Sequence, residues 1–217
     1  IVIKTNDLFI KTFGSIVNQS YGKIQIICIA SEFTEEEKEF IRKDKRAEIF
    51  ESKETLPDSV NVSIGHARGT FIHIVSSGTI LNQSLYATAE KRMRDPSITT
   101  YICGSTLRLT DDSARNDTVN FKEELLNTGV SSVLGNKLLL YACGVSTANK
   151  IFRTDAIRSK TIRLISFDEN ADSPAFVLGV FSNYDKMFVD KTRLIERKHA
   201  NVKPDVETLL NEYYIVR

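Results

Sequence analysis

The chain has 217 residues, of which 41% are hydrophobic and 26% are charged. These are ordinary values for a globular protein, so they exclude wholesale disorder. The 29 Lys and Arg side chains almost balance the 28 Asp and Glu side chains, and the formal net charge is +1. This balance excludes a general positive field, so a polyanion ligand would need a local cluster of basic groups.

The first fifty residues predict a strand followed by a helix. After an extended opening over 1–13, the run 23–30 has the β-branched composition of a strand. Thr34 and Glu37 have the spacing of a capping box, with acidic residues in the first turn and basic residues in the last. We therefore expect a helix over 34–46.

The middle of the chain predicts strands on either side of a short helix. Runs rich in β-branched residues at 60–64 and 70–75 predict two strands. An apolar stripe over 84–94, stopped before Pro96, predicts the helix. Residues 97–110 predict two further strands.

The second half mixes helix and strand signals. A capping residue predicts a helix over 120–128, and the apolar run 137–143 is typical of a strand buried on both faces. Residues 160–167 and 174–181 predict an antiparallel hairpin with a polar turn. A proline predicts the start of a last helix over 204–215, and its apolar stripe indicates docking on its own sheet or on a second copy, as a homo-oligomer.

Strands that come in runs, without regular alternation of strand and helix, favour antiparallel pairing. The sequence thus predicts an α+β, β-rich fold: mainly an antiparallel sandwich or a jelly-roll-like barrel with three to four peripheral helices. We expect a single domain over 1–217, decorated by the helices at 34–46, 120–128 and 204–215.

Three cysteines lie in or beside apolar runs, at positions 28, 103 and 143, without the close spacing of a metal knuckle. We expect them to be small buried hydrophobic residues. Their odd number argues against a disulfide framework and favours a reducing compartment, so we expect a cytoplasmic location. Because no apolar stretch approaches the roughly 20 residues that cross a bilayer, no membrane partner is expected.

The candidate metal sites are incomplete. Asp168, Asn170 and Asp172 have the alternate spacing that opens a calcium loop, but Ser173 and Gly179 stand where that loop needs a glycine and a glutamate. A polar turn explains the same acids. The three histidines are too scattered to indicate a transition-metal centre. We therefore predict no metal site and no cofactor.

One segment comes close to a catalytic motif. Gly144-Val-Ser146-Thr-Ala148 differs from a nucleophile elbow in its last residue. The residues after Ser146 lack the helical stripe that an elbow requires, so we interpret the segment as a glycine-containing exit from a strand. No catalytic residue is assigned, and we favour a chain that is not an enzyme.

Charge provides the main functional hypothesis. Residues 150–203 hold eleven Lys and Arg against seven Asp and Glu, and aromatic residues are interleaved with the bases. Basic groups beside exposed rings are typical of proteins that bind single-stranded nucleic acid. The predicted binding residues are Arg153, Arg158, Lys160, Arg163, Lys191 and Arg193. We thus expect a non-enzymatic binding or assembly protein, and the jelly-roll analogy suggests a viral coat or movement protein.

An enzyme is the alternative. Antiparallel folds often assemble active sites from distant loops. A small hydrolase or nuclease would follow if four carboxylates met in the folded chain: Asp111, Asp112, Asp168 and Asp172.

Overall fold

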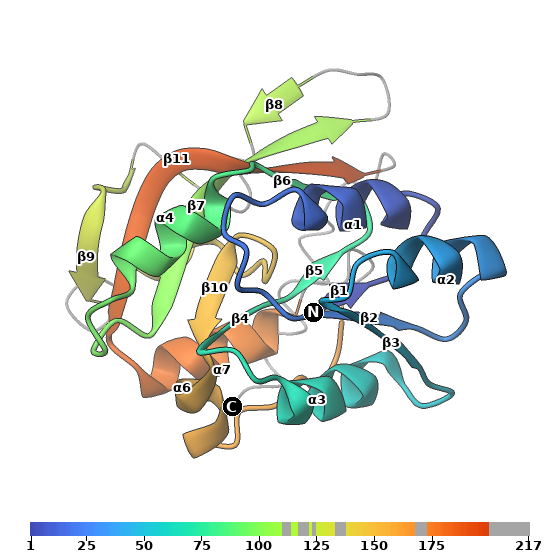
Figure 1. The fold of residues 1–217 in the computed structure, drawn as a ribbon. Helices are drawn as coiled ribbons and strands as arrows, with labels where there is room; N and C mark the ends of the chain where they lie inside the picture. The colour runs from blue at the N-terminus through green and yellow to red at the C-terminus, as the bar shows by residue number, and fades with distance from the viewer. Residues whose placement is uncertain (110–113, 117–121, 123–124, 133–137, 168–172, 200–217) are drawn as a thin grey trace.

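Two connected sheets, one parallel and one mixed, form the centre of the molecule in the computed structural model (Figure 1). The structure describes residues 1–109, 114–116, 122, 125–132, 138–167 and 173–199. The parallel sheet has the strand order β3-β2-β1-β5. The mixed sheet has the order β4-β10-β7-β11-β6, with β8 beside β7 and β9 beside β11.

The parallel sheet is built from the first half of the chain. Its strands are β1 (Val2–Ile3), β2 (Ile26–Ala30), β3 (Ala47–Glu51) and β5 (Val75–Ser76). Every neighbouring pair is parallel. Helix α1 (Phe9–Val17) connects β1 to β2, and α2 (Glu35–Arg42) connects β2 to β3. Because side chains alternate along a strand, Val2 packs on one face of this sheet and Ile3 on the other.

One extended segment joins the two sheets. Only Ile74 separates β4 (Phe71–His73) from β5, and β5 pairs with β1 while β4 pairs with β10. The other strands of the mixed sheet are β6 (Thr79–Leu81), β7 (Thr100–Leu109), β8 (Ala114–Asn116), β9 (Gly129–Ser132), β10 (Lys150–Arg153) and β11 (Lys186–His199). Strands β7 and β11 run parallel to each other, and the other pairings of this sheet are antiparallel.

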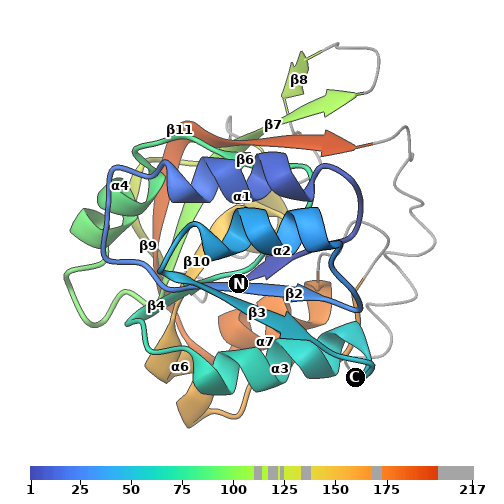
Figure 2. The same ribbon diagram turned by 45° about the vertical axis from the view of Figure 1, so that its right-hand side comes forward.

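Helices cover both faces of the sheets (Figure 2). Helices α1, α2 and α4 (Leu85–Arg92) contribute to one hydrophobic core, around residues such as Phe9 and Phe33. The other face carries a second core, to which four helices contribute: α3 (Leu56–His66), α5 (Leu138–Cys143), α6 (Thr154–Ser159) and α7 (Pro174–Asn183). Among the described residues, no helix combines the length and apolar character needed to cross a membrane.

The predicted antiparallel sandwich or jelly-roll-like barrel is therefore wrong. Three apolar runs that were expected to be strands are helical, because 60–64 lies in α3, 137–143 overlaps α5 and 174–181 lies in α7. Helices inserted between strands allow those strands to run parallel with their faces covered, which a series of hairpins does not. Residues 160–167, expected to be a strand, belong to no strand of either sheet.

Local signals for two of these helices are present in the sequence. The Thr55 side chain accepts a hydrogen bond from the backbone of Asp58, and Pro57 lies in the first turn of α3, both typical of a helix start. In α7, Pro174 is at the start, and Phe176 and Val180 are buried four residues apart. The β-branched composition of these runs masked the helical spacing.

Other predicted helices have different outcomes. The capping box of Thr34 and Glu37 is confirmed, and α2 begins directly after Thr34, but the helix ends at Arg42, before the expected end at 46. The short helix expected over 84–94 is present as α4. The helix expected over 120–128 lies largely outside the described residues, and the one over 204–215 lies entirely outside them.

Candidate ligand site at the carboxyl ends of the parallel strands

The parallel sheet has a topological switch point at β1. From β1 the chain moves to β2 and β3 on one side, and the neighbour on the other side is β5. In open α/β sheets, ligands bind outside the carboxyl ends of the strands at such a point, since the connections lead away in opposite directions. We call the residues that follow these three strands the switch-point edge: 4–6 after β1, 31–34 after β2, and 77–78 after β5.

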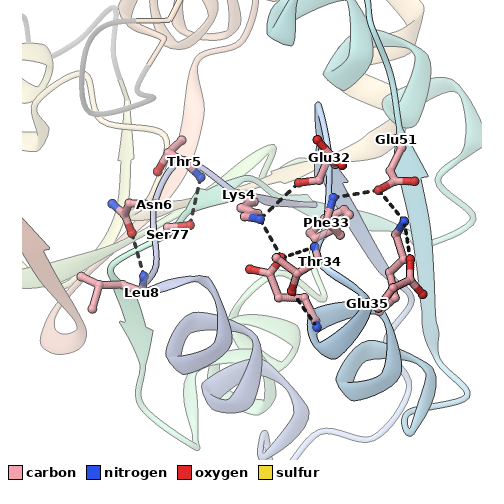
Figure 3. A network of polar contacts seen from close by, with 12 residues as sticks. Lys4, Thr5, Asn6, Leu8, Glu32, Phe33, Thr34, Glu35, Glu51 and Ser77 are labelled. Atoms are coloured by element: carbon pink, nitrogen blue, oxygen red, sulfur yellow. Dashed lines mark hydrogen bonds and ion pairs between the residues drawn. The ribbon is translucent and has the colours of Figure 1, made fainter.

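Lys4 occupies the centre of the switch-point edge (Figure 3). Its Nζ donates to Glu37 Oε2 at 2.6 Å and to the Glu32 carbonyl at 3.2 Å. The same Nζ lies 5.5 Å from the centre of the Phe33 ring, a distance suited to a cation–π contact. A cation from the end of β1 is thus held against the start of α2.

Glu37 links this cation to the helix. Its carboxylate accepts from the Thr34 backbone at 2.8 Å, and its own backbone donates to the Thr34 hydroxyl at 3.2 Å. Burial alone would raise the pKa of Glu37, but hydrogen bonds from Lys4 and from the Thr34 backbone outweigh it and hold that pKa below its usual value. The carboxylate therefore stays ionised, and it keeps Lys4 in place.

Ser77 closes the gap between β1 and β5. Its hydroxyl accepts from the Thr5 backbone at 3.0 Å and donates to the Ile3 carbonyl at 3.3 Å. The next residue, Gly78, has φ of 89°, in the left-handed region that strains other residues, and its backbone donates to the Thr12 hydroxyl at 2.9 Å. The chain thus turns sharply where it leaves β5.

A separate cavity lies away from the switch-point edge. A cavity of ≈ 330 Å³ opens at the amino ends of β1 and β2, where His73 and Tyr86 are among its lining residues. The two rings are joined by a 3.2 Å hydrogen bond, and His73 Nε2 also donates to the Ala148 carbonyl at 2.6 Å. Burial lowers the pKa of His73 to about 3, so the ring is neutral at physiological pH. This cavity is at the opposite edge from the switch point, so we do not assign it to the ligand that the topology predicts.

Two of the predicted nucleic-acid-binding residues, the buried Arg153 and the exposed Arg158, use donors on backbone carbonyls of the protein itself. Arg153 is buried at the end of β10, and its guanidinium donates to the backbone carbonyls of Ile98 (3.2 Å), Met93 (2.7 Å) and Asp95 (3.2 Å). Such a group has little left to offer a phosphate.

Arg158 binds the end of a helix. Its Nη2 donates to the carbonyls of Ile64 (2.6 Å), Gly65 (3.0 Å) and Ala67 (2.6 Å), around the carboxyl end of α3. The last carbonyls of a helix have no partner within it, and basic side chains commonly satisfy them. Arg158 therefore stabilises the fold.

The other four predicted binding residues lie in two separate places. Lys160 and Arg163 are exposed in the segment after α6. Lys191 and Arg193 lie where β11 shifts register against β7, opposite Gly104, where a β-carbon would come 3.0 Å from the Lys191 carbonyl. The sequence grouped all six bases by their position in the chain, and the fold distributes them over β10, α6, the segment after α6 and β11.

The remaining candidates give no catalytic arrangement among the described residues. The Ser146 hydroxyl accepts from the Ala148 backbone at 3.2 Å and from Arg197 Nη1 at 3.0 Å, and it is buried. The four carboxylates of the alternative hypothesis, at positions 111, 112, 168 and 172, lie outside the described residues. Within the part of the chain that is described, no group of three or more His, Cys, Asp or Glu side chains could hold a metal ion.

Solved structures share this fold. TarS 1-349 of S. aureus in complex with UDP-GlcNAc aligns with 93% of this chain at a TM-score of 0.73 and 12% identity. The same protein in complex with UDP aligns with 99% of the chain, at a TM-score of 0.71 and 14% identity. The mannosyltransferase PcManGT from Pyrobaculum calidifontis, in complex with GDP-Man and Mn2+, aligns with 96% at a TM-score of 0.58 and 15% identity.

The chain spans only part of these proteins: 58% of the UDP-GlcNAc complex, 62% of the UDP complex and 58% of PcManGT. No protein-family model matches the sequence, and no curated protein matches it either.

These likenesses correct the functional expectation. A single-stranded nucleic-acid-binding protein, or a viral coat or movement protein, was inferred from basic residues on a jelly-roll-like sheet, and that sheet is not present. Three of the structures that share the fold were solved with UDP-GlcNAc, UDP and GDP-Man. The helix expected to form a homo-oligomer contact, 204–215, lies outside the described residues.

Sequence reasoning missed the switch-point edge, although a weak signal was present. Short polar segments, 4–6 and 76–78, follow apolar runs directly, as expected where a buried strand ends at a ligand site. Their relation depends on the parallel pairing of β1 with β5. With that pairing in place, the chain has a mixed α/β fold that resembles the folds of TarS and of the mannosyltransferase PcManGT.

Proposed function

We propose that this chain is a glycosyltransferase domain that takes a nucleoside-diphosphate sugar as donor and binds it at the switch-point edge. The observation that supports this most is topological. The strand order places β1 between β2 and β5. In addition, 93% of this chain aligns with the structure of TarS 1-349 in complex with UDP-GlcNAc. The edge also presents polar groups to solvent, since Thr5 and Asn6 are exposed directly after β1.

Calorimetric titration tests donor binding. UDP, GDP, UDP-GlcNAc and GDP-mannose are each titrated into the protein, once with Mn2+ and once with excess EDTA. We expect at least one pair of nucleotide and sugar nucleotide to bind with a Kd between about 1 μM and 1 mM, the usual range for enzyme substrates. Absence of binding by all four compounds in both buffers would contradict the proposed function.

Amide chemical shifts then locate the site. With a ligand that binds, we expect the largest shift changes at Thr5, Asn6 and Gly78. Changes confined to Lys23 and Arg68, which line the cavity at the amino ends of the strands, would place the ligand there and contradict the assignment.

We also propose that the protein works in a reducing, cytoplasmic compartment. Its three cysteines are free and buried, and burial raises the pKa of Cys28 and Cys143 to about 12, so neither thiol is reactive in the folded protein. Maleimide labelling of protein taken from cells and unfolded at once checks this. Three labelled thiols are expected, and fewer would argue for an oxidising compartment.

A further inference from the structure

The switch-point edge does not offer the ligands that a divalent metal ion needs. Mg2+ and Mn2+ bind mainly to carboxylate, carbonyl and phosphate oxygens. At the end of β5, residues 76–78 are two serines and a glycine, which bring no carboxylate. The one acid within the switch-point edge is the exposed Glu32, and the nearby Glu37 of α2 is engaged by Lys4 and by a backbone N–H. The Mn2+ present with GDP-Man in PcManGT therefore has no matching donor set among the described residues.

Lys4 places a cation at this edge instead. A lysine ammonium has three hydrogens, and two of them go to Glu37 Oε2 and to the Glu32 carbonyl. No acceptor among the described residues takes the third. The side chain is 22% exposed, so this hydrogen can reach a ligand from solvent.

The neighbouring positive groups are less suitable. The start of α2 is already satisfied by its own capping box and by three acidic residues in its first turn. Lys38 has two carboxylate partners, Glu35 at 3.2 Å and Glu51 at 3.1 Å, whereas Lys4 has one. The charge of Lys38 is therefore more fully neutralised than that of Lys4.

We propose that the diphosphate of the sugar nucleotide binds at the switch-point edge without a divalent metal ion, and that Lys4 supplies the positive charge through its free hydrogen. This inference rests on the function proposed above. Lysine is a common phosphate ligand that acts as a point charge, and a hydrogen bond between two ionised groups is about twice as strong as a neutral one.

Glu37 is the positioning residue in this arrangement. It orients the ammonium before a ligand arrives, and its negative charge also weakens the attraction of Lys4 for a phosphate. Replacing the carboxylate by an amide keeps the capping box, because glutamine at this position caps equally well. Glu37→Gln is therefore expected to strengthen diphosphate binding by about threefold, within the range of a partly exposed ion pair.

The experiment measures the affinity for UDP and GDP in excess EDTA and again with Mn2+. We expect the Kd of the wild-type protein to differ by less than about twofold between the two buffers. Lys4→Met is expected to weaken binding by at least about tenfold in EDTA, as loss of a hydrogen bond to a charged group predicts. The control, Lys38→Met, removes the same charge from a neighbouring lysine in α2. Its Kd in EDTA should stay within about twofold of the wild-type value.

Two further measurements separate the role of the charge from an effect on folding. Lys4→Arg keeps the positive charge and should bind in EDTA within about threefold of wild type, and thermal melting checks that each variant is folded. The electron paramagnetic resonance signal of free Mn2+ should fall no further when protein is added to Mn2+ and UDP than it does with UDP alone. A further fall would show a protein-held metal ion.

The outcomes distinguish this inference from the proposed function. If UDP or GDP binds only with Mn2+, or if Lys4→Met binds as Lys38→Met does, the metal-independent site is wrong and the proposed function stands. If no nucleotide binds in either buffer, both are wrong.

Discussion

The cations of the mixed sheet and the cation at the switch-point edge use their hydrogen-bond donors differently. Lys150, at the start of β10, is fully buried and donates to the Cys143 carbonyl (3.0 Å), the Ser146 carbonyl (2.8 Å) and Asn149 Oδ1 (2.8 Å). Arg153, at the end of the same strand, and Arg158, in the following helix α6, each donate to three backbone carbonyls.

Lys4 has one carboxylate and one carbonyl as partners and is partly exposed. The comparison teaches that the number of basic residues in a segment says little about ligand binding. What matters is how many of their donors the fold has already used.

The largest expected effect concerns Arg153, whose guanidinium already donates hydrogen bonds to backbone carbonyls of the protein. Replacing Arg153 by alanine leaves three carbonyls without their donor in a buried place, so we expect the free energy of unfolding to fall by about 3 kcal/mol or more. Chemical denaturation measures this. The matched control is Arg163→Ala, an exposed residue, whose stability should stay near wild type. If both substitutions lowered the free energy of unfolding equally, the hydrogen bonds of Arg153 would not distinguish it from an exposed arginine.

The next effect concerns the joint between the two sheets, where His73 lies in β4. Its ring is neutral in the folded protein down to about pH 3, whereas in the unfolded chain it binds a proton below about pH 6.5. The unfolded state thus binds more protons between these values, and stability is lost as the pH falls through this window. The loss is about 1.4 kcal/mol per pH unit, or about 2 kcal/mol from pH 6.5 to pH 5.

Substitution isolates this contribution from that of the carboxylates. His73→Gln keeps an N–H for the Ala148 carbonyl and removes the titration, so its unfolding free energy should depend less on pH than that of the wild type. His66→Gln, at an exposed position at the end of α3, is the control. If the pH dependence of His73→Gln matched that of the control, the neutral buried ring would not be its source.

The smallest effect contrasts two bases that the sequence treated alike. Arg158→Ala removes the donor for the carbonyls at the end of α3, and we expect a loss of about 1.5 kcal/mol. Lys160→Ala, two residues on and exposed, should change stability little. Thermal melting of both variants measures the difference. Neither substitution is expected to weaken nucleotide binding, and a loss of binding in Arg158→Ala alone would return this residue to the ligand site.

Sequence reasoning succeeded where the signals for an element lie within it. The capping box of Thr34 and Glu37 marks the start of α2, and the runs 23–30 and 70–75 contain β2, β4 and the first residue of β5. Hydrogen bonds between residues three or four apart decide such elements, so distant parts of the chain have little influence.

It failed where an apolar run had two plausible periodicities. The run in α7 contains Val177 and Phe181, four residues apart, and both are buried in the second core, yet its composition also suits a strand. Whether this run forms a helix or a strand depends on the surface that it covers. That surface is formed by other elements of the fold.

Composition and local spacing by themselves determined a globular chain of strands and helices, the capped start of α2 and three cysteines that pack as apolar residues. Only the tertiary structure decided that β1 pairs in parallel with β5, which brings the Thr5 backbone onto Ser77 across 72 positions of sequence. It also decided that Arg158 donates to carbonyls more than 90 residues away and that one hydrogen of Lys4 has no acceptor within the described part of the chain. The physical reason is that hydrogen-bond partners are chosen by proximity in space, and a sequence pattern carries information mainly about neighbours along the chain.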